Sequence, residues 1–145
     1  MGYTNYWQTA QTNWEDVPEG FVEEAKAALD KVIKSGVKLG LDNMRYKSAK
    51  EIFDVANIAG CTNKYFTIMF NGCDDNSCET FIFTTDGSNR FCKTNRCNYD
   101  IAVKAIIMLA EKYQLLRPSP HDGSYWDFDG KRTDQEFIDA YNLIN

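Results

Sequence analysis

The sequence has little of what marks a catalytic, membrane-spanning or secreted protein. Its 145 residues include one histidine and three prolines. No apolar run approaches the roughly 20 residues that cross a bilayer, so we expect no membrane partner. The chain does not open with a basic segment followed by an apolar one, and we therefore expect a cytoplasmic protein. The motifs G-x-S-x-G and H-E-x-x-H, the P-loop and the dinucleotide-binding glycine pattern are all absent.

An excess of basic residues is missing as well. Asp and Glu outnumber Lys and Arg by 21 to 16, which gives a formal net charge of −5. Binding to nucleic acid needs a basic face, so we expect no nucleic-acid partner. An acidic surface favours solubility, and it can also attract a basic protein. Apolar residues make up 43% of the sequence, enough for a single globular domain over residues 1–145.

Hydrophobic periodicity predicts three helices. A capping box at 16–19 begins an amphipathic helix that ends at Gly36. From an N-cap at Asn98 to Tyr113 the sequence is almost wholly apolar, so this helix must be buried at the centre of the fold. A second capping box, beginning at Thr133, starts a C-terminal amphipathic helix.

Runs of aromatic and β-branched residues predict strands at 3–9, 65–70, 80–84 and 90–93. Short turns join the last three, so we expect them to pair in order as an antiparallel meander. Less regular patterns indicate a strand or short helix at 52–58 and an edge strand at 124–128. The predicted fold class is α+β: an antiparallel β-sheet (meander) with a buried central helix and two amphipathic helices packed mainly on one face.

Cysteine spacing leaves several interpretations open. The five cysteines are Cys61, Cys73, Cys78, Cys92 and Cys97, and the last four are spaced C-x4-C-x13-C-x4-C. This spacing is slightly wide for zinc, and disulfides are disfavoured in the cytoplasm, so we expect free thiols and no metal or cofactor. Register in the meander brings Cys78 close to Cys97. The acidic turn after Cys73 resembles half of a calcium loop but lacks its glycine and distal glutamate.

The turn between the third meander strand and the apolar helix is the best candidate for an anion site. Lys93 and Arg96 bracket this turn beside a helix N-terminus, where free backbone N–H groups favour negative charge. A structural ion-pair cluster is the alternative, with Arg96 paired to Asp100 or to Glu79. His121, the single histidine, lies beside an acid in a loop and could serve acid–base chemistry.

Four short blocks carry a family resemblance: Gly2-Tyr3-Thr4-Asn5-Tyr6-Trp7; Phe70-Asn71-Gly72 with Glu79-Thr80-Phe81; Phe91-Cys92-Lys93-Thr94…Arg96…Tyr99-Asp100-x-x-Val103; and Asp122-Gly123 with Trp126. Together they resemble a family of small uncharacterised bacterial and phage proteins without an established activity. Members usually carry His in place of Asn5 and Pro in place of Asn98, and Cys92 alone of the cysteines fits the pattern. The many polar and aromatic positions in these blocks imply a shared pocket.

These observations lead us to expect a non-catalytic binding protein with a polar-aromatic pocket for a small anionic, nucleotide-derived ligand. The expected site residues are Tyr6, Trp7, Glu79, Lys93, Arg96, Tyr99 and Asp100. In a phage, such a protein would sequester a host immune signal. One alternative is an acidic interaction module that inhibits a basic host protein. Another is a small enzyme that acts on a nucleotide or sugar through Glu79, Asp100 or His121. Homo-oligomerisation is left open.

Overall fold

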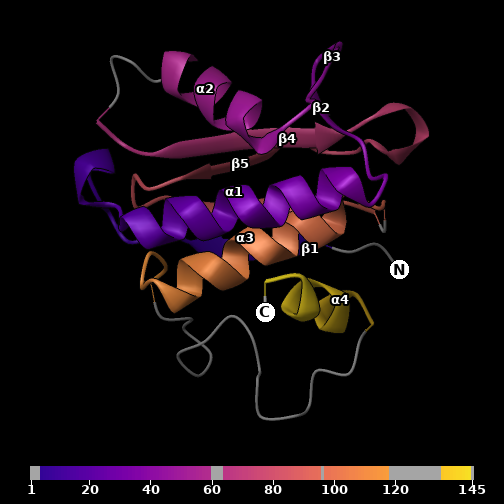
Figure 1. Ribbon diagram of the computed structural model, residues 1–145. Coiled ribbons are helices and arrows are strands. Elements are labelled where there is room, and N and C mark those ends of the chain that lie inside the picture. Colours follow the sequence, from indigo (N-terminus) through magenta and orange to yellow (C-terminus); the bar gives the residue numbers. More distant parts are fainter. Residues whose placement is uncertain (1–3, 60–63, 96, 118–134, 145) are drawn as a thin grey trace.

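Two antiparallel sheets and four α-helices make up the fold (Figure 1), as seen in a computed structural model that describes residues 4–59, 64–95, 97–117 and 135–144. The four-stranded sheet has the order β3-β2-β4-β5 and the two-stranded sheet pairs β1 with β6. The strands are β1 (Thr4–Gln8), β2 (Leu39–Leu41), β3 (Met44–Arg45), β4 (Thr67–Gly72), β5 (Phe81–Thr84) and β6 (Asn89–Lys93). The helices are α1 (Glu19–Lys34), α2 (Ala49–Ala59), α3 (Asp100–Lys112) and α4 (Gln135–Ile144), with short 3₁₀ helices η1 (Trp14–Asp16) and η2 (Asp74–Asn76).

Helices α1 and α3 lie side by side beneath the β4–β5 hairpin (Figure 1). The stripe expected for α1 is buried, and its Phe21 ring packs 5.9 Å from the rings of both Phe66 and Phe83. Ten of the thirteen residues of α3 are buried, because α1, α4 and β1 pack against it. The α+β class, the antiparallel strands and the buried central helix are therefore confirmed.

The expected meander is wrong at its third strand. Strands β4 and β5 pair as predicted, but β6 pairs with β1 instead of with β5. Residues that follow β1 hold the turn after β5. Thr9 Oγ1 accepts the N–H of Gly87, the Thr85 hydroxyl donates to the carbonyl of Thr12, and the Thr12 N–H donates to the carbonyl of Thr85. These bonds tie the turn to the segment that follows β1, and β6 then pairs with β1.

The expected cap of the apolar helix is wrong, and the alternative left open at 52–58 is decided in favour of a helix. Helix α3 begins at Asp100, and Tyr99 occupies the N-cap position. Asn98, whose side chain is exposed, is therefore not the cap. Residues 52–58 belong to helix α2. The N–H of its first residue, Ala49, donates to Asp30 Oδ1 at 2.8 Å, and this bond fixes the start of the helix. The edge strand expected at 124–128 and the capping residue Thr133 lie outside the described residues. No helix in the described ranges is long and apolar enough to cross a membrane.

Candidate functional site

Strand alternation separates the residues of β1 and β6 into two sets. Asn5, Trp7 and Cys92 point inward and are buried, whereas Tyr6 and Phe91 point outward and are 65% and 59% exposed. Tyr6 and Trp7 therefore lie on opposite faces of β1 and do not wall one pocket together. Within the described residues, the indole Nε1 of Trp7 is buried without a hydrogen-bond partner.

A buried polar network joins β1, the end of β6 and α3. Asp100 Oδ1 accepts hydrogen bonds from Asn5 Nδ2 at 2.8 Å and from Thr94 Oγ1 at 2.6 Å. Its Oδ2 pairs with Lys104 Nζ at 2.5 Å, and Lys104 also donates to Asn5 Oδ1 at 3.1 Å. Asp100 and Lys104 are 3% and 1% exposed, so both charges are removed from water. The network satisfies them internally, and Asp100 has little capacity left for a ligand.

The start of α3 likewise offers few free donors to an anion. The backbone N–H groups of Asp100 and Ala102 donate to the carbonyls of Cys97 and Tyr99, both at 3.0 Å. Because these bonds use donors that a helix N-terminus would otherwise present, the helix end contributes less to anion binding than the sequence suggests.

Tyr99 and Cys92 converge on one backbone carbonyl. The Tyr99 hydroxyl donates to the Glu79 carbonyl oxygen at 2.6 Å, and the Cys92 thiol lies 3.4 Å from the same oxygen. Burial raises the pKa of Tyr99, and burial raises the pKa of Cys92 from its usual 9.0 to about 12. Tyr99 is buried in the core, and its hydroxyl holds the backbone of Glu79, in the segment that leads into β5. Its ring is therefore not available as the wall of an open pocket.

The raised pKa of Cys92 predicts a loss of stability at high pH. The unfolded thiol ionises from about pH 9 and the native thiol only near pH 12, so its contribution is complete below pH 9 and falls as the pH rises. In Cys92→Ala the free energy of unfolding should fall less steeply with pH than in the wild type, by up to about 1.4 kcal/mol per pH unit. Urea unfolding between about pH 8 and 10.5 measures this slope. Cys73→Ala is the control, and equal slopes for Cys92→Ala and the wild type would contradict the prediction.

The outer face of the β1–β6 ribbon presents an aromatic pair. Lys93 donates its N–H to Glu79 Oε1 at 2.6 Å and accepts from the Glu79 N–H at 3.2 Å, so its backbone groups point away from β1. Lys93 and its partner Thr4 therefore form a non-hydrogen-bonded pair. Tyr6 and Phe91, two residues further along the strands, form a pair of the same kind, in which facing side chains approach most closely. Their ring centroids are 6.1 Å apart.

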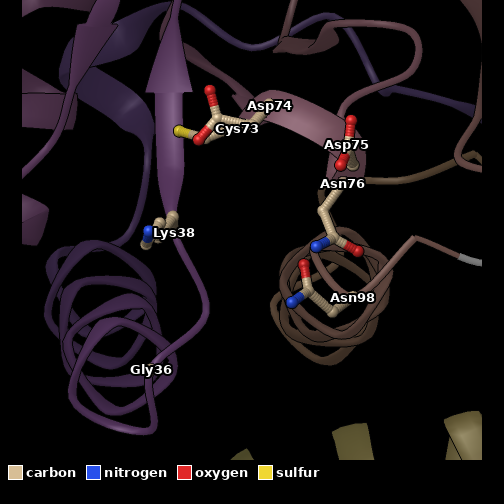
Figure 2. A pocket seen from close by; sticks show the side chains of 7 residues that line it. All are labelled: Gly36, Lys38, Cys73, Asp74, Asp75, Asn76 and Asn98. Carbon is tan, nitrogen blue, oxygen red and sulfur yellow. The ribbon is translucent and has the colours of Figure 1, made fainter.

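A polar cleft of about 200 Å³ lies on another part of the surface. Figure 2 shows it between the end of α1 and the start of α3, below the turn that follows β4. Its lining residues are Gly36, Lys38, Cys73, Asp74, Asp75, Asn76 and Asn98. The cleft combines one ammonium group, two carboxylates and two amides, and none of the six expected site residues that the structure describes lines it.

The structure brings together part of the expected site. Lys93 and Glu79 are neighbours at the end of β6, and both are exposed. Trp7, Tyr99 and Asp100 are buried, and Tyr6 faces outward from the opposite side of β1. Arg96 and His121 lie outside the described residues.

The expected site residues leave out three members of the buried network and one half of the aromatic pair: Asn5, Thr94, Lys104 and Phe91. All of these except Lys104 stand in the sequence blocks that imply a shared pocket. A signal for Lys104 was present, because it is a lone cation in an apolar helix and follows Asp100 by four residues. Phe91 is directly opposite Tyr6 only because β6 pairs with β1.

The four described cysteines are free: Cys73, Cys78 and Cys97 are half-buried, and Cys92 is buried. Over the described ranges, no group of three or more His, Cys, Asp or Glu side chains is placed to hold a metal ion. Cys61 lies outside these ranges.

Comparisons with models of protein families, with curated proteins and with solved structures find no match for this chain. The resemblance described from the sequence blocks therefore stays a prediction, and a function has to be inferred from the residues themselves.

Proposed function

We propose that this chain is a non-catalytic binding protein that docks a partner protein through the outer face of β1 and β6. The observation that carries the proposal is the exposed Tyr6–Phe91 pair. Large aromatic side chains at the centre of a patch contribute most of the binding energy in many protein interfaces. This face is the outer side of a two-stranded sheet, and an aromatic pair on such a face fits a macromolecular partner better than a small ligand.

The surroundings of the aromatic pair have the composition of an interface rim. On the same face, register places Thr4 opposite Lys93 and Gln8 opposite Asn89. These four side chains are polar and half-buried or exposed. An apolar centre inside a polar rim is the usual anatomy of a protein–protein interface.

The charge of the chain favours a basic partner. The net charge of −5 gives a long-range attraction toward a positively charged protein, which raises the rate of encounter. We therefore propose a basic protein with an apolar patch as the occupant, and in a phage setting this would be a host protein. Salt should weaken the complex because it screens this attraction.

Site-specific photo-crosslinking tests the docking face. A photo-reactive amino acid at Asn89, which is exposed on this face, should give one discrete adduct in the cells that contain the protein. The double substitution Tyr6→Ser and Phe91→Ser should abolish the adduct, while it lowers the free energy of unfolding by no more than about 1 kcal/mol. Mass spectrometry of the adduct then shows whether the partner is basic.

The same photo-reactive group at Trp14 is the matched control. Trp14 is 60% exposed on η1 and lies outside the docking face. The proposal fails if the Asn89 adduct survives the double substitution, or if both positions give the same set of adducts.

A second candidate function is small-molecule binding in the polar cleft, and the cleft itself is the observation that favours it. Lys38 would pair with an anionic group of the ligand, and Asp74 and Asp75 with cationic or hydroxyl groups. Native mass spectrometry of the purified protein tests this directly. A mass excess that is lost on denaturation and absent in Lys38→Glu would support it, and a bare mass would leave the docking face as the proposed site.

A further inference from the structure

The side chain of Asn71 fixes the backbone of Cys78 in place. Its Oδ1 accepts the N–H of Cys78 at 3.1 Å, and its Nδ2 donates to the Cys78 carbonyl at 2.9 Å. Asn71 is itself part of β4, which is paired on both sides. The position of the Cys78 Cα is therefore determined by the sheet, although Cys78 lies in a turn.

The chain from β6 to α3 contacts the turn on both sides of Cys78. The Cys97 thiol lies 3.8 Å from the carbonyl oxygen of Ser77. On the other side of Cys78, the Tyr99 hydroxyl and the Cys92 thiol both reach the carbonyl oxygen of Glu79. Cys78 thus lies between the carbonyl groups of Ser77 and Glu79, and the chain from β6 to α3 contacts both of them. Cys97, which contacts the first, faces Cys78 from this chain.

Exposure distinguishes the thiols of this region. Cys78 and Cys97 are half-buried and accessible to small reagents, whereas Cys92 is buried. Because Cys92 is fully buried, a small disulfide cannot reach its thiol. Burial and the neighbouring Cys78 also raise the pKa of Cys97, so its attack on a disulfide should be faster at mildly alkaline pH, where more of this accessible thiol is ionised. Cys73 lines the polar cleft, beside Gly40 of β2.

We propose that Cys78 and Cys97 form a redox-active dithiol, which closes to an intramolecular disulfide when it meets a low-molecular-weight disulfide such as oxidised glutathione. One cysteine thiolate attacks a sulfur of the small disulfide, so that a mixed disulfide forms and one small thiol leaves. The second thiolate then attacks the protein sulfur of the mixed disulfide and displaces the second small thiol. The protein loses two electrons and two protons, and the oxidant gains both as two thiols.

The disulfide would tie the turn before β5 to the residues that precede α3. It would close a loop that contains the whole of β5 and β6. Closing a loop of this length restricts the unfolded chain, so the oxidised protein should unfold at a temperature higher by roughly 5 to 10 °C.

Non-reducing peptide mapping of the wild-type protein tests the proposal without any substitution. The protein is treated with oxidised glutathione, unreacted thiols are blocked under denaturing conditions, and the linked peptides are identified. We expect a Cys78–Cys97 link, a loss of two hydrogens from the intact mass and the rise in unfolding temperature. A map without this link, or with another cysteine pair in its place, would overturn the proposal.

Single substitutions test the order of events. Cys78→Ser or Cys97→Ser should stop the reaction at the mixed disulfide and leave one glutathione attached, whereas Cys73→Ser should form the link as the wild type does. Both cysteines are half-buried, so serine should be tolerated at each. An intramolecular disulfide between any other cysteines in Cys78→Ser or Cys97→Ser would also overturn the proposal.

Discussion

Lys104→Met is expected to destabilise the protein by about 3–5 kcal/mol, because it leaves the buried carboxylate of Asp100 without its counter-charge. Methionine matches the length of the lysine side chain, so the loss reflects charge and not an empty space. Asn5 and Thr94 would still donate to the carboxylate, but neutral donors compensate a buried charge only in part. Urea unfolding at neutral pH measures the difference.

The double variant Asp100→Asn with Lys104→Met is the control. With both charges removed, no unpaired charge remains buried, so this variant should be more stable than Lys104→Met alone. The ion pair is not desolvated as its burial implies if the losses of stability in Asp100→Asn and Lys104→Met simply add in the double variant. A loss below about 1 kcal/mol for Lys104→Met would show the same.

Gly72→Ala is expected to destabilise the protein by about 3 kcal/mol, at the upper end of the usual cost of overpacking. A Cβ atom at Gly72 would overlap the backbone oxygen of Asn76 and lie 2.8 Å from Cδ1 of Tyr99. One neighbour is backbone and the other is a buried ring, so neither can move without displacing the turn after β4 or the start of α3. Thermal and urea unfolding of the variant measure the loss.

Gly20→Ala adds the same atom where it can be accommodated. The three atoms nearest to its Cβ would all belong to the end of the Tyr113 side chain, and alanine favours the helix that glycine disfavours. This variant should therefore have a stability within about 1 kcal/mol of the wild type. If Gly72→Ala is equally benign, the turn does not pack on Gly72 as described.

Much of the secondary structure could be predicted from the sequence, because it depends on local periodicity. The stripe of α1 and the apolar run of α3 place their buried residues without knowledge of any partner. The same holds for β4 and β5, which follow one another along the chain and pair across the loop that contains η2. The partner of β6 could not be predicted in this way, because the bonds that direct it come from Thr9 and Thr12, more than seventy residues earlier.

The candidate site was predicted less well than the fold, and for a related reason. Tyr6 and Trp7 are adjacent in sequence, but a strand sends them to opposite faces, so their chemical similarity did not imply a common site. Asp100 was chosen as a ligand-binding acid, but the structure pairs it with Lys104. Sequence patterns show which residues carry chemistry; burial determines which of them solvent or a partner can reach.

The buried network has a consequence for the order in which the chain folds. Asn5 lies 95 residues before Asp100 and 99 before Lys104, so β1 bonds to a helix that is synthesised long after it. Contacts of such high sequence separation are slow to form. Strand β1 must therefore wait, unpaired, until β6 and α3 have been made. A nascent chain that ends before α3 should consequently expose β1 to proteases and chaperones.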